Sequence, residues 1–482
     1  MAFRDLPEFA AALEKRGWLK RIKAPVSARL EIAEITDRVS KQPGGGHALL
    51  FENVRESPYP VLINAFGSLE RICLALGVEH LDDIGAEIKG LMQLPGPGGG
   101  LWDKLGSGLK LLDVAKNTAP KLLRSAPCQE VVEAEVDLTR LPVLTCWPED
   151  GGPFITFGLT FTRDPETGTR NVGLYRLHLY DKQTTGMHWH RHKDARRQAE
   201  KLPGGRLEAA VVLGADPVTM YTASAPLPPV VPELMFAGFL RKEPVELVRC
   251  KSIDMEVPAH AEFVLEGYID TGEERIEGPF GDHTGFYSPA DPYPVFHVTC
   301  VTHKRNPVFP ATLVGKPPQE DVYLGKATER LFLPLMQLVL PEIIDVNMPP
   351  EGAFHNCVLV RINKRYPGHA RKVVHGLWGL GLMMLAKLIV VVDADTDVQD
   401  LSYTAWKVFQ NVDPKRDLFF AEGPADDLEH ASPVWRYGSK LGVDATKKLP
   451  EEGHPRPWPN EIQMTPEIVD LVTKRWREYG LA

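Results

Sequence analysis

The feature that most constrains the fold is a long strand-rich stretch between residues 126 and 313. Short segments rich in β-branched and aromatic residues follow one another there, separated by turns such as the one at residues 305–307. A series of short strands joined by tight turns is typical of a β-barrel or a β-sandwich. We expect one helix, at residues 232–240, to interrupt the series. The predicted strands are residues 154–162, 171–180, 186–192, 207–213, 246–257, 262–269, 295–302 and 308–313.

The sequence before this stretch predicts a mixed α/β region. Apolar residues recur at helical spacing over residues 6–13, and short strands follow at residues 48–51 and 61–65. The segment PGPGGG at residues 95–100 is the clearest linker signal. A glycine run can cradle a phosphate, but no strand leads into this one and prolines interrupt it. We therefore expect the first domain to comprise residues 1–125.

Strands and helices alternate after the strand-rich stretch. This rhythm is typical of a parallel α/β sheet, in which a helix connects each strand to the next. After Thr465, apolar residues recur every three or four positions, which predicts an amphipathic helix that packs on its own chain or on a partner subunit. The second and third domains are expected at residues 126–314 and 315–482. The predicted elements are strands at 358–362, 388–392 and 418–421 and helices at 368–386 and 401–409.

Composition argues against several classes of protein. Lys and Arg total 55 against 64 Asp and Glu. This net charge of −9 argues against a nucleic-acid-binding protein that neutralises the phosphates of its partner. The six cysteines form no C-x-x-C pair, so a zinc ribbon or redox dithiol finds no support, and we expect reduced thiols in the cytoplasm without a signal peptide. The longest apolar stretch, residues 376–392, is interrupted by Lys387 and is too short for a membrane span. At most a peripheral membrane association is expected.

Three histidines alternate in the segment HWHRH at residues 188–192. If the segment is a strand, His188, His190 and His192 share one face, which suggests metal ligation. Polar residues on a wet barrel face are the alternative interpretation. An antiparallel hairpin would also bring Asn171 to the same open end as His192. An amide oxygen and an imidazole nitrogen could share an ion there, such as Mn²⁺.

A second cluster of reactive side chains lies in EGPFGDHTG at residues 277–285. Its glycines and proline predict a tight loop that presents Glu277, Asp282 and His283 together. Two neighbouring carboxyl groups can be driven to different pKa values, one ionised and one protonated, which suits general acid–base catalysis. A nearby arginine would lower the pKa of one of them. A solvated polar turn is the alternative.

In combination, several segments resemble the UbiD family of reversible decarboxylases, which use prenylated FMN (prFMN). The similarity extends over nearly the whole chain in the expected order and is closest to the polyprenyl-4-hydroxybenzoate decarboxylase branch. It implies an α/β multidomain fold whose central part is a split β-barrel of the flavin-binding type. The matching segments are NVGLYR (171–176), the tryptophan–histidine run, LGADP (213–217), Glu233 before FAG (236–238), EGPFGDHTG, APCQ (126–129), TCWPED (145–150) and GSK (438–440).

The resemblance implies a metal site and a cofactor site. Asn171, His192 and Glu233 match the ligands of a divalent ion, usually Mn²⁺, that clamps the cofactor phosphate, and K⁺ is a further candidate ion. Lys193 and Asp194 fall where the family often has arginine and glycine, and an acid at that position would repel phosphate. Lys387 is either a phosphate ligand or an ordinary lysine beside a strand. The residues that match cofactor-lining positions are Leu174, Tyr175, Arg176, His188, Trp189, His190, Lys193 and Asp194.

The resemblance also implies a catalytic network of an arginine and two acids, matched by Arg176, Glu277 and Asp282. Loss of CO₂ from an aromatic carbon leaves charge on an sp² carbon, and acid–base catalysis alone contributes only about 10²–10⁴-fold. An electron sink is needed, and the cofactor is expected to supply it. We expect Asp282, or Glu277 through it, to protonate the carbon that lost CO₂, while Arg176 orients the acids and the substrate carboxylate.

The expected activity is that of a carboxy-lyase acting on an aromatic or unsaturated acid. A polyprenyl-4-hydroxybenzoate of a ubiquinone-type pathway is the first candidate substrate, and smaller aromatic or heteroaromatic acids are alternatives. The family implies a flavin prenyltransferase as cofactor supplier and a homo-oligomer, either a dimer or a hexamer. Two competing hypotheses are a zinc hydrolase that uses the three alternating histidines with Glu277 as base, and a flavin-storage protein. Arg176 and the paired acids weigh against storage, which needs none of them.

Overall fold

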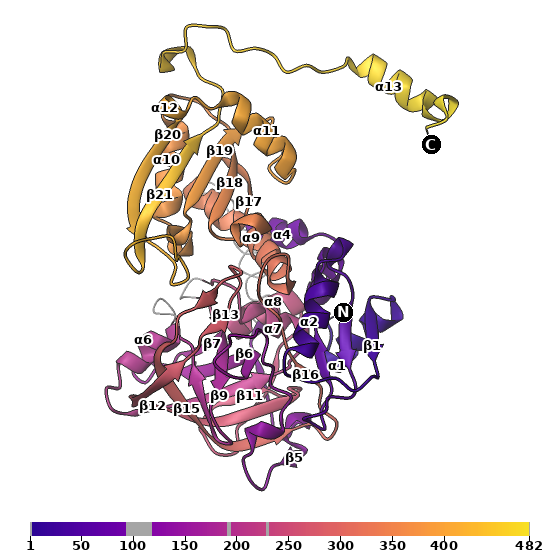
Figure 1. The fold of residues 1–482 in the computed structure, drawn as a ribbon, viewed down its shortest axis with the longest axis vertical. Coiled ribbons are helices and arrows are strands. Elements are labelled where there is room, and N and C mark those ends of the chain that lie inside the picture. Colours follow the sequence, from indigo (N-terminus) through magenta and orange to yellow (C-terminus); the bar gives the residue numbers. More distant parts are fainter. Residues whose placement is uncertain (1, 93–117, 190–193, 228–230, 482) are drawn as a thin grey trace, which may run out of the picture.

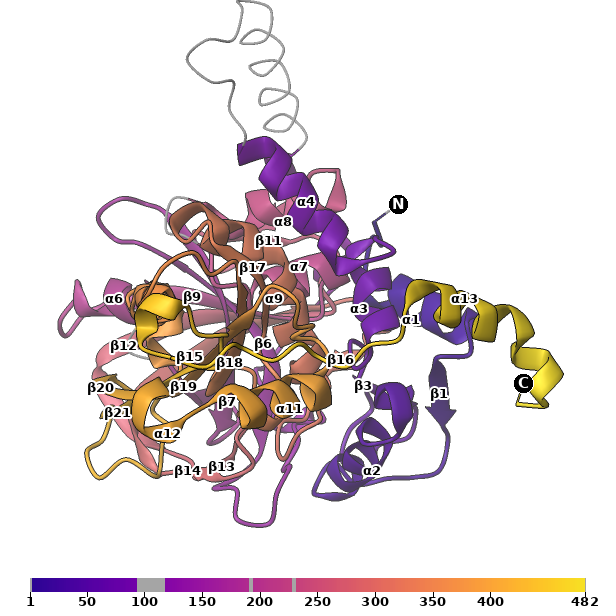
Figure 2. The same ribbon diagram turned by 90° about the horizontal axis from the view of Figure 1, so that it is seen from above.

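The computed structural model describes residues 2–92, 118–189, 194–227 and 231–481. These residues form an N-terminal sheet, a central barrel, a C-terminal sheet and an extended C-terminal arm, residues 462–481 (Figure 1). Seen from above, the C-terminal sheet lies over the barrel, and the N-terminal region lies beside it (Figure 2). The arrangement confirms the expected α/β multidomain fold with a barrel at its centre.

Six antiparallel strands close into the central barrel. Their hydrogen-bonded order is β12-β9-β6-β7-β8-β15, and β15 pairs back with β12 to complete the ring. Strand β7 carries residue 176 and strand β12 ends at residue 277, so closure of the ring positions two of the predicted catalytic residues. The strands are β6 (Phe154–Arg163), β7 (Arg170–Leu179), β8 (Thr184–Met187), β9 (Arg206–Leu213), β12 (Phe263–Glu277) and β15 (Asp291–His303).

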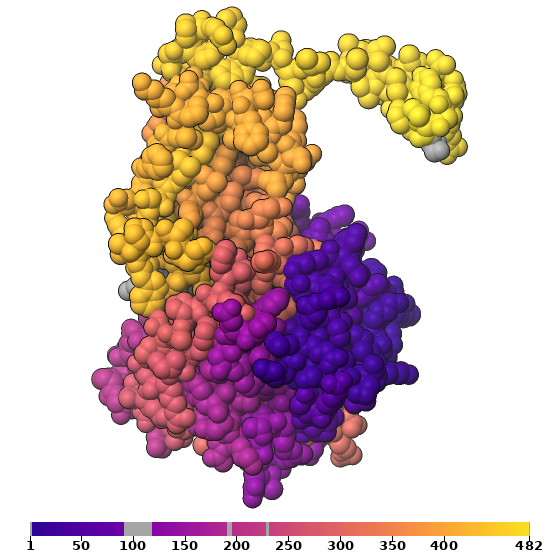
Figure 3. Space-filling model, in the orientation of Figure 1, coloured from indigo at the N-terminus to yellow at the C-terminus, as the bar shows by residue number. Residues whose placement is uncertain are grey.

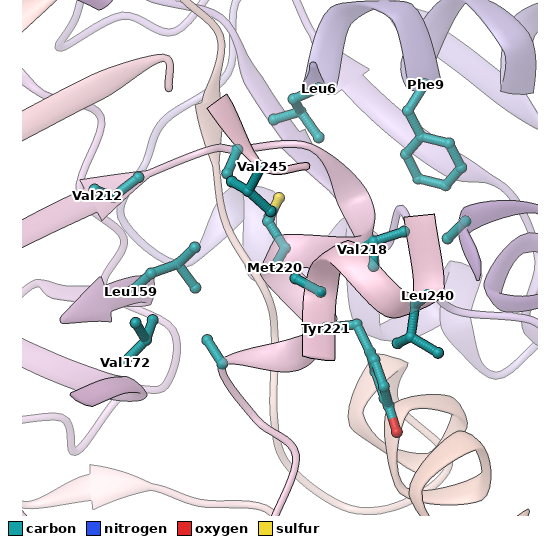
Figure 4. Close-up of a cluster of buried hydrophobic side chains, with 14 of the residues drawn as sticks. Leu6, Phe9, Leu159, Val172, Val212, Val218, Met220, Tyr221, Leu240 and Val245 are labelled. Atoms are coloured by element: carbon teal, nitrogen blue, oxygen red, sulfur yellow. The ribbon is translucent and has the colours of Figure 1, made fainter. Parts of the chain in front are cut away.

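Helices α7 and α8 join the barrel to the N-terminal region. Leu6 and Phe9 of helix α1 gather with Val218 and Met220 of α7 and Leu240 of α8 in one buried cluster (Figure 4). Burying a side chain of this kind contributes about 1.5–3 kcal/mol. The remaining elements around the barrel are β4 (Lys121–Leu123), β5 (Val131–Val132), α6 (Asp194–Glu200), α7 (Pro217–Thr222), α8 (Glu233–Arg241), β10 (Glu246–Arg249), β11 (Glu256–Pro258), β13 (Phe280–Gly281) and β14 (Tyr287–Ser288).

The N-terminal sheet has the order β1-β2-β3-β16. Its last strand comes from the segment after the barrel, where a barrel strand was predicted over residues 308–313. Phe309 pairs with Val61 in parallel, so this segment ties the barrel to the N-terminal sheet instead. The elements are α1 (Leu6–Lys15), β1 (Leu19–Ile22), α2 (Glu31–Ser40), β2 (Ala48–Phe51), β3 (Val61–Ile63), α3 (Leu69–Leu76), α4 (Leu81–Met92) and β16 (Phe309–Pro310).

The C-terminal sheet has the order β17-β18-β19-β21-β20. Strands β18, β19 and β21 run parallel, as predicted, but both edge strands are antiparallel to their neighbours. Helix α9 links the barrel to this sheet. The elements are α9 (Glu320–Val339), β17 (Ile343–Asn347), β18 (Cys357–Ile362), α10 (His369–Trp378), β19 (Leu388–Asp393), α11 (Leu401–Asn411), α12 (Pro414–Asp417), β20 (Leu418–Pro424) and β21 (Tyr437–Asp444).

Three predicted elements have different lengths in the structure. The strand predicted at 246–257 is a pair of antiparallel strands, β10 and β11. The helix predicted at 368–386 ends at Trp378, and Gly381 then adopts a left-handed conformation with φ of +50°, which a continuous helix does not allow. The strand predicted to end at residue 269 continues to Glu277. The prediction was too short because the last residues of this strand are polar and mostly exposed, so they show no alternation of apolar and polar positions.

The C-terminal arm ends in helix α13 (Pro466–Arg475), at the position predicted from the apolar repeat. The arm stands away from the C-terminal sheet in the space-filling view (Figure 3). Its apolar side chains are exposed; Leu471 and Trp476, for example, expose 47% and 46% of their surface. In the part of the chain that the structure describes, none of the helices combines the length and apolar character needed to cross a bilayer.

Candidate active site

A cavity of about 310 Å³ lies between the barrel and the C-terminal region. The barrel side contributes residues of β6 and β7 and of the segment after β12, and the C-terminal side contributes residues 426–428 and Trp435. Its volume falls in the range of small-molecule sites. Predicted cofactor and catalytic residues that line it are Leu174, Tyr175, Arg176, His188 and Asp282.

Arg176 joins both predicted catalytic acids in the wall of this cavity. Its Nε donates to Glu277 Oε1 at 2.8 Å, and its Nη2 donates to Glu277 Oε2 at 3.1 Å. Its Nη1 donates to Asp282 Oδ2, and Nη2 also donates to the Ser288 hydroxyl at 3.0 Å. The guanidinium stacks over the Phe280 ring, 4.6 Å from the ring centre. Arg176 exposes only 9% of its side chain and Glu277 none, so this network is held out of bulk water.

The pKa values of the two acids shift in the same direction. Burial alone would raise the pKa of Glu277, but hydrogen bonds from His188 and Arg176 and the charge of Arg176 lower it to about 2. Burial likewise opposes ionisation of Asp282, yet Arg176 and His283 hold the pKa of that carboxyl well below its usual range. The expectation of one ionised and one protonated acid is therefore wrong for this state, because one guanidinium stabilises both anions.

The loop between the two acids is fixed by backbone contacts. Asp150 Oδ1 accepts the Gly281 N–H at 2.8 Å, and its other oxygen accepts the N–H groups of Cys146 and Trp147. Gly278 has φ of +90°, a conformation that favours glycine, and directs the chain back after β12. Glu277 is thus the last residue of a strand rather than part of the predicted loop. The turn that follows brings Asp282 to the opposite side of the same guanidinium.

A chain of hydrogen bonds leads from Asp282 to the C-terminal region. His283 Nδ1 lies 2.9 Å from Asp282 Oδ1, and His283 Nε2 lies 2.8 Å from His355 Nε2. His355 follows Phe354, whose ring stacks on His283 with a centroid distance of 5.2 Å. Asp321 also lines the cavity; burial raises its pKa to about 7, and its Oδ2 has no hydrogen-bond partner among the described residues.

The predicted metal ligands are placed only in part. Asn171 lies near the start of β7, where its Nδ2 donates to the Thr162 hydroxyl at 3.4 Å, and Glu233 is the first residue of α8, a helix that packs on β7. His190 and His192 lie outside the described residues. Among the residues that the structure does describe, no three histidine, cysteine or acidic side chains gather as a metal site. His188 follows the end of β8, so at least this part of the predicted 186–192 strand is wrong.

Of the predicted cofactor-lining residues that the structure describes, four line the cavity, namely Leu174, Tyr175, Arg176 and His188. Trp189, a further predicted cofactor-lining residue, is buried, and its indole N–H has no acceptor among the described residues. Such a donor costs about 1–3 kcal/mol unless a ligand supplies an acceptor. Lys193 lies outside the described residues, and Asp194 begins α6. Lys387 lies elsewhere: its Nζ pairs with Glu429 at 3.0 Å, and it lines a separate cavity of about 460 Å³ in the C-terminal sheet.

Several residues of the site were not anticipated from the sequence. Ser288, Tyr293, Asp321 and His355 contact or surround the network, and the Tyr293 ring packs at a tilt against His188 with a centroid distance of 4.4 Å. They come from separate parts of the chain and carry no local spacing that marks them. For Ser288 alone, its nearness to the EGPFGDHTG segment offered a signal.

Comparison with protein families assigns most of the chain. Three models of the UbiD family match it: the N-terminal domain of 3-octaprenyl-4-hydroxybenzoate carboxy-lyase over residues 10–88, its Rift-related domain over 121–317 and its C-terminal domain over 322–445. An uncharacterized protein of Archaeoglobus fulgidus is 48% identical over 483 residues, which cover 99% of each chain.

Solved structures give the same result. The UbiD-class enzyme HmfF from Pelotomaculum thermopropionicum, in complex with FMN, superposes with a TM-score of 0.80 at 30% identity over 97% of this chain and 98% of that one. An evolved dimeric form of HmfF in complex with prFMN gives 0.79 at 28% identity over the same shares. Vanillic acid decarboxylase of Sedimentibacter hydroxybenzoicus, in its closed form, gives 0.84 at 26% identity over 99% of both chains.

These matches decide between the hypotheses at the level of the family. The family is described as a carboxy-lyase, and the similar structures include a decarboxylase and flavin complexes. The zinc-hydrolase hypothesis finds no support among them. With three family models covering most of its length in order, the chain belongs to the UbiD family.

Proposed function

We propose that this protein is a prFMN-dependent carboxy-lyase that removes CO₂ from an aromatic acid. The observation that carries the proposal is the position of Arg176 between the buried Glu277 and Asp282, in the wall of a cavity large enough for a ring system. A flavin-storage protein would have no use for such a network. When bound, prFMN would supply the electron sink that acid–base groups cannot provide.

The protein groups have distinct proposed tasks. Arg176 holds both carboxylates and presents its positive charge to the cavity, where a substrate carboxylate has to be oriented. Asp282 borders the cavity and is the proposed acid that delivers a proton to the carbon. Glu277 is fully buried behind Arg176 and fixes the guanidinium through two hydrogen bonds. Because water is largely excluded, these charge interactions are stronger than they would be in solution.

Binding of the cofactor phosphate is proposed to involve a divalent ion. Asn171 and Glu233 lie on two elements that pack together, β7 and α8, and offer an amide and a carboxylate oxygen. With His192 as third ligand, such a mixed oxygen and nitrogen set suits Mn²⁺. K⁺ stays a further candidate ion.

The proposed substrate is a 4-hydroxybenzoate-type acid. Asp321 borders the cavity with a buried oxygen that has no hydrogen-bond partner within the described part of the chain, and this oxygen can pair with a phenolic hydroxyl. The similarity to vanillic acid decarboxylase supports a phenolic acid. Trp435 lines the cavity but is 53% exposed, an apolar rim that suits a polyprenyl chain. Smaller aromatic acids are the alternative.

The test is purification from a host that co-expresses a flavin prenyltransferase, the proposed cofactor supplier. Mass spectrometry of the released cofactor is expected to give prFMN, and metal analysis is expected to give about one Mn²⁺ per chain. The loaded protein is then assayed for CO₂ release and ¹³CO₂ exchange with 4-hydroxybenzoate, its 3-prenylated derivatives, vanillate and heteroaromatic acids. Bound flavin without exchange into any acid would favour storage, and flavin-free protein with tightly bound zinc would favour the hydrolase.

The assembly is proposed to be a homo-oligomer with three domains per chain, at 1–125, 126–314 and 315–482. The exposed apolar residues of the C-terminal arm support a subunit contact, since isolated apolar helices of this kind are usually covered. A cytoplasmic location stays a prediction from the cysteines.

A further inference from the structure

The two acids that Arg176 holds lack the proton that the reaction consumes. Decarboxylation converts R–COO⁻ and one proton into R–H and CO₂, so each turnover needs a proton on the donor acid. Arg176 holds both Glu277 and Asp282 as anions. A neighbouring group must therefore transfer a proton to one of them.

His283 is placed to do this. Its Nδ1 lies 2.9 Å from Asp282 Oδ1, and its backbone N–H donates to the same oxygen at 2.8 Å. The imidazole borders the cavity and is held by stacking on Phe354. On its other side, Nε2 faces Nε2 of His355 at 2.8 Å. Two imidazole nitrogens in contact share one hydrogen, so one ring donates and the other accepts.

The surrounding charges decide which ring is protonated. Asp282, Asp321 and Asp426 face His283, and although burial opposes its charge, these acids raise its pKa above 6.5. His355 is faced by His283, Asp282, Asp426 and Glu429, and burial together with the charge of His283 lowers its pKa to about 4. Of the two rings, His283 is therefore the one that binds the proton more readily, and His355 is the acceptor.

We propose that His283 supplies the proton that recharges Asp282, and that His355 is the positioning residue that keeps its ring aligned. This inference rests on the proposed decarboxylase function. The Nδ1 proton of the His283 cation moves to Asp282 Oδ1, leaving neutral His283 and a neutral carboxyl group. That carboxyl gives its proton to the carbon that has lost CO₂ and returns to the anion, and water then reprotonates His283. One proton is consumed per CO₂ released.

The partner of His283 comes from the C-terminal region. Phe354 and His355 precede β18, whereas His283 follows the barrel strand β12. The contact therefore joins the barrel region to the C-terminal region. Substitution of His355 alone should therefore change the protonation of His283 on the barrel side of the site.

The first test measures protonation without any turnover. Full-length protein labelled with ¹³C at histidine Cε1 is titrated by NMR, and the His283 signal is assigned by its loss in His283→Gln. We expect His283 to titrate above pH 6.5. His355→Leu, which removes the acceptor, should lower that midpoint, whereas His355→Gln, which retains an acceptor, should largely preserve it. The exposed His375→Asn is the control and should leave the signal in place. A His283 that is neutral at pH 6 would overturn the proposal.

The second test uses protein loaded with prFMN and follows kcat against pH. Activity should fall as pH rises through the His283 midpoint found by NMR, because neutral His283 cannot recharge Asp282. His283→Gln should lower kcat by about 10²-fold, abolish that alkaline limb and change KM little. An unchanged limb in His283→Gln would sink the proton-source assignment while decarboxylation itself persisted. If loaded wild-type protein decarboxylated nothing, the proposed function would fail instead, and the NMR result would stand separately.

Discussion

Arg176 and Glu277, 101 residues apart in the sequence, meet through two hydrogen bonds of 2.8 and 3.1 Å between one guanidinium and one carboxylate. The pairing requires the planar geometry of arginine, because two N–H groups address two oxygens of the same carboxylate. A third nitrogen is then left for Asp282 on the other side. Arg176 thus sets the positions of both acids. Because three of its nitrogens are used, the network should be disrupted even by a substitution that preserves the positive charge.

Arg176→Lys is expected to lower kcat of the loaded enzyme by at least about 10²-fold. A lysine is a single point donor that can hold Glu277 or Asp282 but not both in place. Cofactor content, measured from the flavin absorbance, should change much less. Arg206→Lys, at an exposed arginine on β9 that stacks on Tyr268, is the matched control and should keep near wild-type activity. Equal rates for Arg176→Lys and wild type would remove the guanidinium from the mechanism.

Glu277 should make the apoprotein sensitive to acid. Its pKa falls from 4.5 to about 2 in the folded state, so its stabilising effect is complete above pH 4.5 and is lost as pH falls towards 2. The shift corresponds to about 3 kcal/mol over the whole window, of which about half is lost between pH 5 and pH 3.

Urea unfolding at pH 5, 4 and 3 measures this contribution. Glu277→Gln should start less stable than wild type and then lose less stability on acidification. Glu274→Gln, an exposed acid on the same strand, should follow the wild-type pH dependence. Parallel curves for Glu277→Gln and wild type would show that the carboxylate does not stabilise the fold as an anion.

Much of the barrel could be predicted from the sequence, because buried strands such as β6, β7 and β9 have clear β-type composition and short turns between them. The polar end of β12 could not, since an exposed strand has no apolar alternation, and the closure of the ring joins β12 to β15 over a long stretch of chain. The predicted end of the helix at 368–386 was wrong for a local reason, because Gly381 adopts a left-handed conformation. The mixed direction of the C-terminal sheet also has no local signal.

The site was predictable as a set of residues but not as an electrostatic arrangement. The EGPFGDHTG segment itself predicted that Glu277, Asp282 and His283 lie together, and the family resemblance added Arg176. The structure brings these residues together. The protonation of the two acids depends on burial, on the charge of Arg176 and on hydrogen bonds with His188 and His283, and sequence spacing does not reveal the balance of these effects. The same is true of His355, which reaches the network only through the packing of the C-terminal region on the barrel.

Glu233→Ala is expected to cost the protein its cofactor rather than its fold. The proposed ion at this position would anchor the phosphate, and removing one of three ligands weakens metal binding by at least about 10-fold. Flavin absorbance and Mn²⁺ content should fall together, while the thermal unfolding midpoint of the apoprotein stays near that of wild type. Glu243→Ala, at an acid that is 52% exposed just after the same helix, should retain both. Full flavin retention by Glu233→Ala would argue against this ligand assignment.

The C-terminal arm is expected to hold subunits together. Ile468, Leu471 and Trp476 lie three to five positions apart on the arm and expose 44%, 47% and 46% of their surface, although apolar side chains of this size are usually buried. Covering each in a subunit contact contributes about 1.5–3 kcal/mol. The double variant Leu471→Ser/Trp476→Ser should therefore weaken association by at least about 10²-fold. Light scattering after gel filtration at micromolar concentration is expected to give an oligomer for wild type and a smaller species for the variant. Lys474→Ser, on the same helix, should behave as wild type, and a wild-type protein that runs as a monomer would contradict the assignment of this arm as a contact.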